Sequence, residues 1–153
     1  MAYKIIRSSN ASAIADVNER SVNAKNGIRI FELGDLSGVT SRAKAESIRR
    51  KLVAAHVSIR QLTNATNMHA WTKVAGLESL MQMRHVDPGL CRITNEILIF
   101  DSTVAIYRVA LSVDYLEVQD ESYAAMMRDI FDTVWSSARP MRVGEGGAAE
   151  IMQ

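Results

Sequence analysis

The chain has 153 residues, of which 48% are hydrophobic and 23% charged, with two prolines and one cysteine. This composition is typical of one folded globular domain and excludes a disordered or fibrous chain. The single cysteine, Cys91, excludes an intrachain disulfide and a cysteine-based zinc site. The formal net charge of +1 argues against a dedicated nucleic-acid or membrane-surface binder.

The first residues lack the apolar run of a secretory signal, and no stretch approaches the roughly 18 apolar residues that span a bilayer. We therefore expect a cytoplasmic protein without membrane contact. The charges are divided unevenly, because residues 1–60 carry 11 Lys or Arg against 5 Asp or Glu, while residues 61–153 carry 7 against 12. Opposite-sign segments could complement each other within the fold or between two copies.

The first half of the chain alternates between strand and helix patterns. An edge strand is predicted over 3–6, and a helix follows that ends at Asn26-Gly27. The next three elements are a strand over 28–33, a helix over 41–56 and a strand over 57–62. A strand, a helix and a strand in this order imply a parallel unit, so the fold class is α/β.

The second half predicts a helix over 69–80, a strand over 81–86, a hairpin formed by 92–100 and 104–111, and a strand over 113–118. The strongest helical pattern covers 121–138. Asp120 can cap that helix, and its polar side includes Asp132. Its apolar stripe must cover a sheet and contains Tyr123, Met127, Ile130, Phe131, Val134, Trp135 and Ala138.

These elements predict a single domain over 1–141. Its sheet is expected to be mixed, mostly parallel and flanked by helices, with a C-terminal antiparallel hairpin and a covering helix. Residues 142–153 contain the run Gly-Glu-Gly-Gly and predict a flexible tail.

The element order over 27–140 resembles one half of the phospholipase-D-like superfamily. In that family a helix-flanked sheet is followed by a hairpin bearing a His-x-Lys-x4-Asp signature and by a C-terminal helix. The apolar run 97–101, which ends in Asp101, is similar to the run that ends in the family's aspartate. Residues 115–118, followed by a helix with Phe131 and Trp135, are similar to the family's final strand and helix.

If Asp101 takes the place of the family's aspartate, Thr94 stands at the histidine position and Glu96 at the lysine position. The family's reaction needs imidazole nucleophiles and acids, and a cation that holds the phosphoryl oxygens. Threonine has no suitable base beside it, and Glu96 would repel the substrate. The resemblance therefore implies a catalytically inactive relative, similar to the sensor domains of TrmB-like transcription regulators. Because no winged helix-turn-helix fits before Gly27, we expect a stand-alone domain or one that acts through a separate partner.

Candidate ligand-binding residues lie at the carboxyl ends of the predicted strands and near the hairpin, where α/β sheets often place ligands. They would form an anion-binding pocket, and the alternative is a set of solvated loops. No metal site or cofactor is predicted, because His56 and His69 lack companions at metal-ligand spacing. The candidates are Glu32, Asp35, Arg60, Arg84, His85, Arg92, Thr94, Glu96 and Asp101.

Three functions follow from these observations. The first is a binding or regulatory module that recognises a small anionic ligand or a protein partner and forms a homodimer, as the resemblance implies. The second is a nucleic-acid-associated accessory domain, which requires one exposed basic stripe made of Arg42, Lys44, Arg49, Arg50 and Lys51. The third is an enzyme with reassigned residues, which requires a cleft with at least two perturbed titratable groups.

Overall fold

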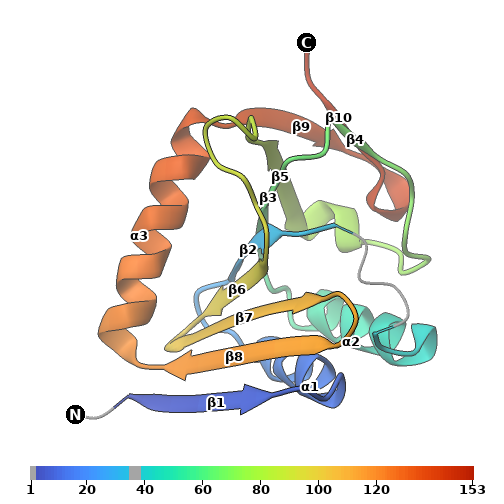
Figure 1. Cartoon of the computed structure of the whole chain (residues 1–153). Coiled ribbons are helices and arrows are strands. Elements are labelled where there is room, and N and C mark those ends of the chain that lie inside the picture. The colour runs from blue at the N-terminus through green and yellow to red at the C-terminus, as the bar shows by residue number, and fades with distance from the viewer. Residues whose placement is uncertain (1–2, 35–38) are drawn as a thin grey trace.

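The computed structural model describes residues 3–34 and 39–153 (Figure 1). The helices are α1 (Ser12–Ser21), α2 (Arg42–Ala54) and α3 (Glu121–Ser137), with 3-10 turns η1 (Leu77–Leu80) and η2 (Glu145–Gly147). The strands are β1 (Lys4–Ser8), β2 (Ile28–Glu32), β3 (Ile59–Thr63), β4 (Asn67–Met68), β5 (Met81–His85), β6 (Glu96–Phe100), β7 (Thr103–Val109), β8 (Val113–Gln119), β9 (Arg139–Val143) and β10 (Ala149–Ile151).

The described strands form one mixed sheet in the order β1-β8-β7-β6-β2-β3-β5-β9-β10-β4. The predicted parallel unit is confirmed, because β2 pairs in parallel with β3, and β3 in parallel with β5. The predicted hairpin is confirmed as well, since β6 pairs antiparallel with β7. The parallel part is smaller than the sequence predicted, because the other pairings in the described residues are antiparallel.

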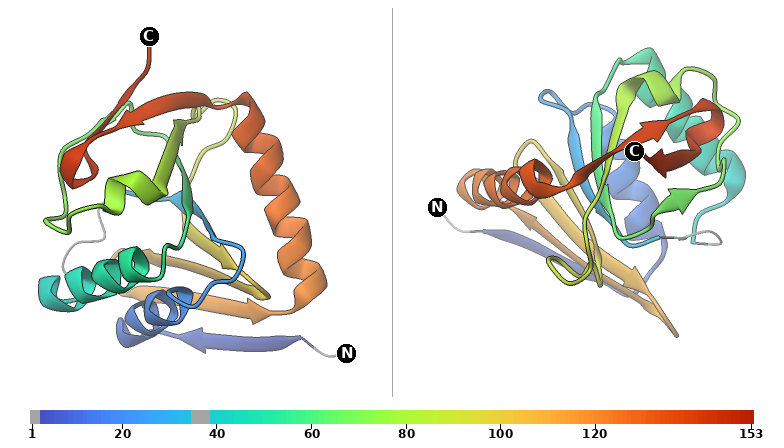
Figure 2. Two further views of the ribbon diagram at one scale, coloured as in Figure 1. Left: turned by 180° about the vertical axis from the view of Figure 1, so that it is seen from behind. Right: turned by 90° about the horizontal axis from the view of Figure 1, so that it is seen from above.

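Helices cover both faces of this sheet (Figure 2). On one face α1 and α2 bury Ile14, Val17, Ile48 and Leu52 against the strands. The α2 helix begins where Ser41 accepts a hydrogen bond from the Lys44 amide, 3.2 Å away, which satisfies one of the free amides of its first turn.

The predicted covering helix α3 packs on the opposite face of the sheet. The Asp120 carboxylate caps it by accepting from the Tyr123 amide at 2.8 Å. Phe131 is fully buried and meets Phe31 edge to face, with ring centroids 5.1 Å apart. The predicted stripe is wrong at Ile130, which is 46% exposed, because the covering face of the helix is narrower than the apolar pattern.

The polar side of α3 is also less solvated than its sequence indicated. The Asp132 carboxylate accepts two hydrogen bonds from the Arg29 guanidinium of β2, at 2.9 and 3.1 Å. Asp132 therefore ties α3 to the centre of the sheet.

The predicted helix over 69–80 is wrong. Only Leu77–Leu80 forms a short 3-10 turn, and residues 69–76 before it form neither helix nor strand. The Trp71 and Thr72 amides donate to the Gly146 carbonyl, and the Trp71 indole donates to the Gly147 carbonyl at 3.0 Å. These tertiary hydrogen bonds with the C-terminal segment override the local helical pattern.

The predicted flexible tail over 142–153 is instead part of the sheet. Strand β9 pairs with β5, and β10 pairs with β9 and β4. Gly146 and Gly147 have φ of 71° and 81°, and a Cβ at Gly147 would lie 2.4 Å from the Trp71 ring. The glycines that indicated flexibility thus form a tight turn that only glycine fits.

Among the described residues, no helix has the length and apolar character needed to cross a bilayer.

Candidate functional site

Five side chains, one from each of β5, β3, β2, β6 and β7, lie side by side in a row across the sheet. The row lies at the carboxyl ends of β2 and β3. The strand registers place Glu32 opposite Thr63, Thr63 opposite His85, and Glu96 opposite Tyr107. The antiparallel register of β2 and β6 continues to place Glu32 opposite Glu96. Because residues that face one another across neighbouring strands share a face of the sheet, all five side chains lie on the face covered by α1 and α2. We call them the carboxyl-edge row.

The two carboxyl groups of the row resist ionisation. Glu32 is 7% exposed, its Oε2 has no hydrogen-bond partner among the described residues, and burial raises its pKa despite the Thr63 hydroxyl. Burial raises the pKa of Glu96 to about 7, and the charge of Glu32 adds to this rise. The Tyr107 hydroxyl and the Leu33 amide, 3.4 Å from Glu96 Oε1, oppose it. The pair therefore holds a proton near neutral pH.

The two ends of the row are held by neighbouring polar groups. Burial raises the pKa of Tyr107 well above its usual value, and the charge of Glu96 adds to this effect. The Tyr107 hydroxyl lies 3.4 Å from the Asn18 amide nitrogen of α1. At the other end, His85 Nδ1 lies 2.9 Å from the Ala65 carbonyl oxygen. The surface has one hollow beside α2 and another beside β10. No residue of the carboxyl-edge row lines either of them.

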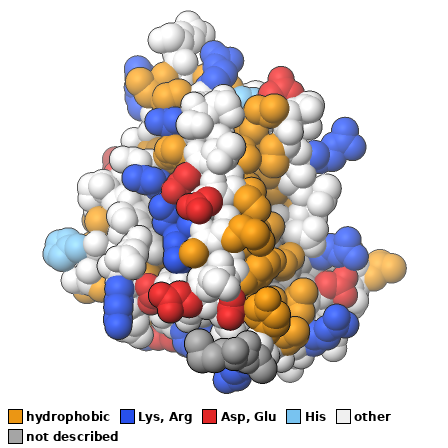
Figure 3. All heavy atoms as spheres, turned by 90° about the vertical axis from the view of Figure 1, so that its left-hand side faces the viewer, with side chains coloured by type: hydrophobic (Ala, Val, Ile, Leu, Met, Phe, Trp, Pro, Cys, Tyr) orange, Lys and Arg blue, Asp and Glu red, His pale blue; other side chains and the backbone are white. Residues whose placement is uncertain are grey.

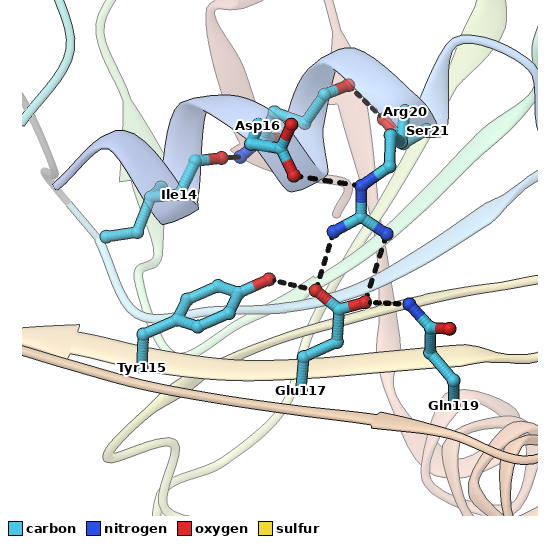
Figure 4. A network of polar contacts seen from close by, with 8 residues as sticks. Ile14, Asp16, Arg20, Ser21, Tyr115, Glu117 and Gln119 are labelled. Atoms are coloured by element: carbon cyan, nitrogen blue, oxygen red, sulfur yellow. Dashed lines mark hydrogen bonds and ion pairs between the residues drawn. The ribbon is translucent and has the colours of Figure 1, made fainter. Parts of the chain in front are cut away.

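A second buried carboxylate lies on β8 and has the opposite character (Figure 4). Glu117, 1% exposed, accepts from Arg20 of α1 at 2.6 and 3.0 Å, and also from the Tyr115 hydroxyl and the Gln119 amide. Burial opposes its ionisation, but these three donors outweigh burial and hold the pKa of Glu117 below its usual value. The ion pair between Arg20 and Glu117 therefore links α1 to β8, beside the end of the row that lies on β7.

The structure brings only three of the sequence-predicted site residues into the row: Glu32, His85 and Glu96. Arg60 and Arg84 lie on the opposite face, beneath α3. Arg84 donates to the Trp135 carbonyl at 2.8 Å, and its guanidinium lies 4.7 Å from the Trp135 ring centroid.

The other candidates lie elsewhere. Arg92 and Thr94 are exposed in the segment before β6. Asp101 lies in the turn at the far end of β6, roughly 17 Å of strand from Glu96, and accepts from the Lys25 amide at 3.0 Å. Asp35 lies outside the described residues. The structure therefore does not bring the described members of this set together in one pocket, because strand alternation and strand length separate them.

The sequence patterns did not single out Tyr107. A signal for Tyr107 was present, because a hairpin that turns at residues 101 and 102 places residue 107 opposite residue 96.

The basic residues of α2 do not form the single stripe that the nucleic-acid hypothesis required. Lys44 and Lys51 pair with Glu19 of α1. Arg49 pairs with Glu46 at 3.5 Å and stacks over the Trp71 ring, 4.6 Å from its centroid.

No protein-family model and no curated protein sequence matches the chain. Solved structures do match its fold. NucT from Helicobacter pylori has a TM-score of 0.60 at 9% identity, over 90% of this chain and 98% of that chain. The phospholipase D family member Nuc from Salmonella typhimurium has a TM-score of 0.57 at 13% identity, over 92% and 98%. TrmBL2, an archaeal chromatin protein, has a TM-score of 0.55 at 15% identity, over 90% of this chain and 54% of that one.

The chain thus has the phospholipase-D-like α/β fold, as the sequence resemblance implied. It spans nearly the whole length of Nuc and NucT but only about half the length of TrmBL2.

Proposed function

We propose that this chain is a binding or regulatory domain with the phospholipase-D-like fold that does not hydrolyse phosphodiesters. The observation that carries the proposal is Glu96, which stands at the position that the resemblance gives to a lysine. It lies opposite Glu32 and has a pKa of about 7. A carboxyl group in either protonation state supplies no positive charge to a phosphoryl oxygen.

The histidine position gives further support. Thr94 is exposed, and its hydroxyl oxygen accepts a hydrogen bond from the Asn95 side-chain amide at 3.2 Å. An amide cannot act as the base that a hydroxyl nucleophile needs. A module that keeps the fold without these two groups is suited to binding a small ligand or a protein partner.

Turnover of bis(p-nitrophenyl) phosphate tests this proposal. We expect no release of p-nitrophenol above the buffer rate for the wild type. Turnover that is lost in both Thr94→Ala and Glu96→Gln would overturn the proposal and favour an enzyme with reassigned residues. Turnover of equal size in the wild type and in both variants would identify a contaminating enzyme instead.

We further propose that the chain forms a homodimer through an apolar band along α3. The band is seen in Figure 3 and comprises Tyr123, Met126, Met127, Ile130 and Val134, of which Met126 and Ile130 are 52% and 46% exposed. An isologous interface needs a surface that complements itself, and an apolar surface does so without matched charges. The opposite charge bias of residues 1–60 and 61–153 would add attraction between two copies.

Light scattering at high micromolar concentration tests the dimer. We expect twice the 16.9 kDa monomer mass for the wild type and the monomer mass for Ile130→Glu. Ser136→Glu adds the same charge at an exposed position on another side of α3 and should remain dimeric. A monomeric wild type would refute the proposal.

A nucleic-acid-associated role is the second candidate, favoured by the likeness to TrmBL2, for which a mode of DNA binding is described. The division of the α2 cations between two partners weighs against it. Fluorescence anisotropy with duplex DNA at physiological salt separates the two: micromolar affinity with a steep salt dependence would replace our first proposal with this one.

A further inference from the structure

A hollow of about 480 Å³ lies on the surface between α2 and residues 73–75, which precede η1. Its volume falls in the range of small-molecule sites. The hollow is separate from the carboxyl-edge row, so what it binds does not depend on whether the chain is an enzyme. Its wall includes Arg42, Glu46, Arg50, Val53, Lys73 and Val74.

The helical repeat brings two arginines to this hollow. Arg42, Glu46 and Arg50 follow one another at intervals of four residues, so they lie along one side of α2. Lys73 faces them from the neighbouring segment. Three cationic side chains therefore surround one hollow, although residues 42 and 73 are far apart in the sequence.

Glu46 holds the two walls together. It is 8% exposed and accepts from the Thr72 hydroxyl at 2.6 Å and from the Lys73 amide at 3.1 Å. It also pairs with Arg49 at 3.5 Å. These donors use both of its oxygens, so Glu46 fixes the position of the Lys73 backbone, and it shares its negative charge with Arg49.

The three cations differ from Lys44, Arg49 and Lys51, the other basic residues of α2. Lys44 and Lys51 pair with Glu19, and Arg49 pairs with Glu46. Among the residues that the structure describes, Arg42, Arg50 and Lys73 have no ion-pair partner within 4.0 Å. The wall thus carries three cations against the single carboxylate of Glu46, and this excess of positive charge makes the hollow attractive to an anion.

We propose that this hollow binds the phosphate group of a small phosphorylated molecule. The guanidinium forks of Arg42 and Arg50 suit the bidentate recognition of phosphate oxygens, and the ammonium of Lys73 adds a third positive charge. The apolar side chains of Val53 and Val74 offer a surface for the remainder of such a ligand.

A single phosphate group fits this site better than a nucleic-acid backbone does. A polymer needs a row of cations that follows successive phosphates. The remaining cations of α2 are Lys44 and Lys51, which Glu19 holds on another side of the helix, and Arg49, which pairs with Glu46.

Isothermal titration calorimetry with pyrophosphate and with adenosine 5′-monophosphate tests the proposal. We expect saturable binding to the full chain, weakened about tenfold or more by Arg50→Gln and by Lys73→Gln, since each removes a charge-assisted hydrogen bond. Lys44→Gln and Lys51→Gln are matched controls on the same helix and should bind as the wild type does. Thermal melts of each variant confirm that it is folded.

Three outcomes would overturn the proposal. The first is no heat of binding with either probe at millimolar concentration. The second is equal weakening by Lys51→Gln and Arg50→Gln, which would mean diffuse attraction to the basic surface. The third is binding of an oligonucleotide, lost in Arg50→Gln, without binding of either small probe, which would assign the hollow to a nucleic acid.

Discussion

Replacing Glu96 by glutamine should make the protein more stable above neutral pH. Glu96 has a pKa of about 7 in the folded chain, against 4.5 for an unperturbed glutamate. The folded state therefore holds the proton more tightly than the unfolded state does. The stabilisation that this proton provides is complete below about pH 4.5 and is lost as the pH rises through about 7.

The size of the effect follows from the two pKa values. A pKa difference of about 2.5 corresponds to about 3 kcal/mol of free energy of unfolding, lost by the wild type between pH 4.5 and a pH well above 7. Glutamine has the shape of the protonated side chain and does not ionise. Glu96→Gln should match the wild type near pH 4.5 and exceed its stability by about 2–3 kcal/mol near pH 9.

Urea denaturation followed by tryptophan fluorescence measures both proteins across this pH range. The difference between the two free energies reports Glu96 together with its coupling to Glu32, because the other titrating groups are common to both proteins. Glu121→Gln, at an exposed position of α3, is the control and should follow the wild type. A difference between wild type and Glu96→Gln that stays constant with pH would refute the reasoning.

Three further variants test the packing. Phe131→Ala should lower the free energy of unfolding by about 3–5 kcal/mol, because it empties a fully buried aromatic site. Asp132→Ala should cost about 1–2 kcal/mol, since it leaves the half-buried Arg29 guanidinium without its bidentate partner. Gly147→Ala should cost about 1–3 kcal/mol and loosen β10, because its Cβ would collide with the Trp71 ring at a positive φ. Urea denaturation measures all three.

Two of these expectations have a specific result that would contradict them. Asp129→Ala, at an exposed position of α3, is the control for Asp132→Ala and should stay within about 0.5 kcal/mol of the wild type. Equal losses in the two would show that the pair with Arg29 contributes nothing. A Gly147→Ala protein as stable as the wild type, with unchanged amide protection in β10, would mean that the C-terminal strands are not part of the cooperative fold.

The sequence alone determined much of the fold, because hydrophobic periodicity is a local property. The parallel unit, the hairpin and α3 were all predicted, together with the Asp120 cap. The resemblance that led to the phospholipase-D-like fold depended on the same local patterns, read in order along the chain. Glu96 could be singled out for the same reason, since its place follows from a fixed spacing to Asp101.

Tertiary structure alone decided where those residues face and what they contact. Strand alternation sends Arg84 beneath α3 and Glu96 beneath α1, although both had been assigned to one pocket. The C-terminal glycines form a turn against Trp71, a contact between segments some 75 residues apart that no local pattern contains. The hollow between Arg50 and Lys73 arises in the same way. Sites of this kind depend on long-range packing, which places distant segments side by side, whereas periodicity records only which neighbours in the chain share a face.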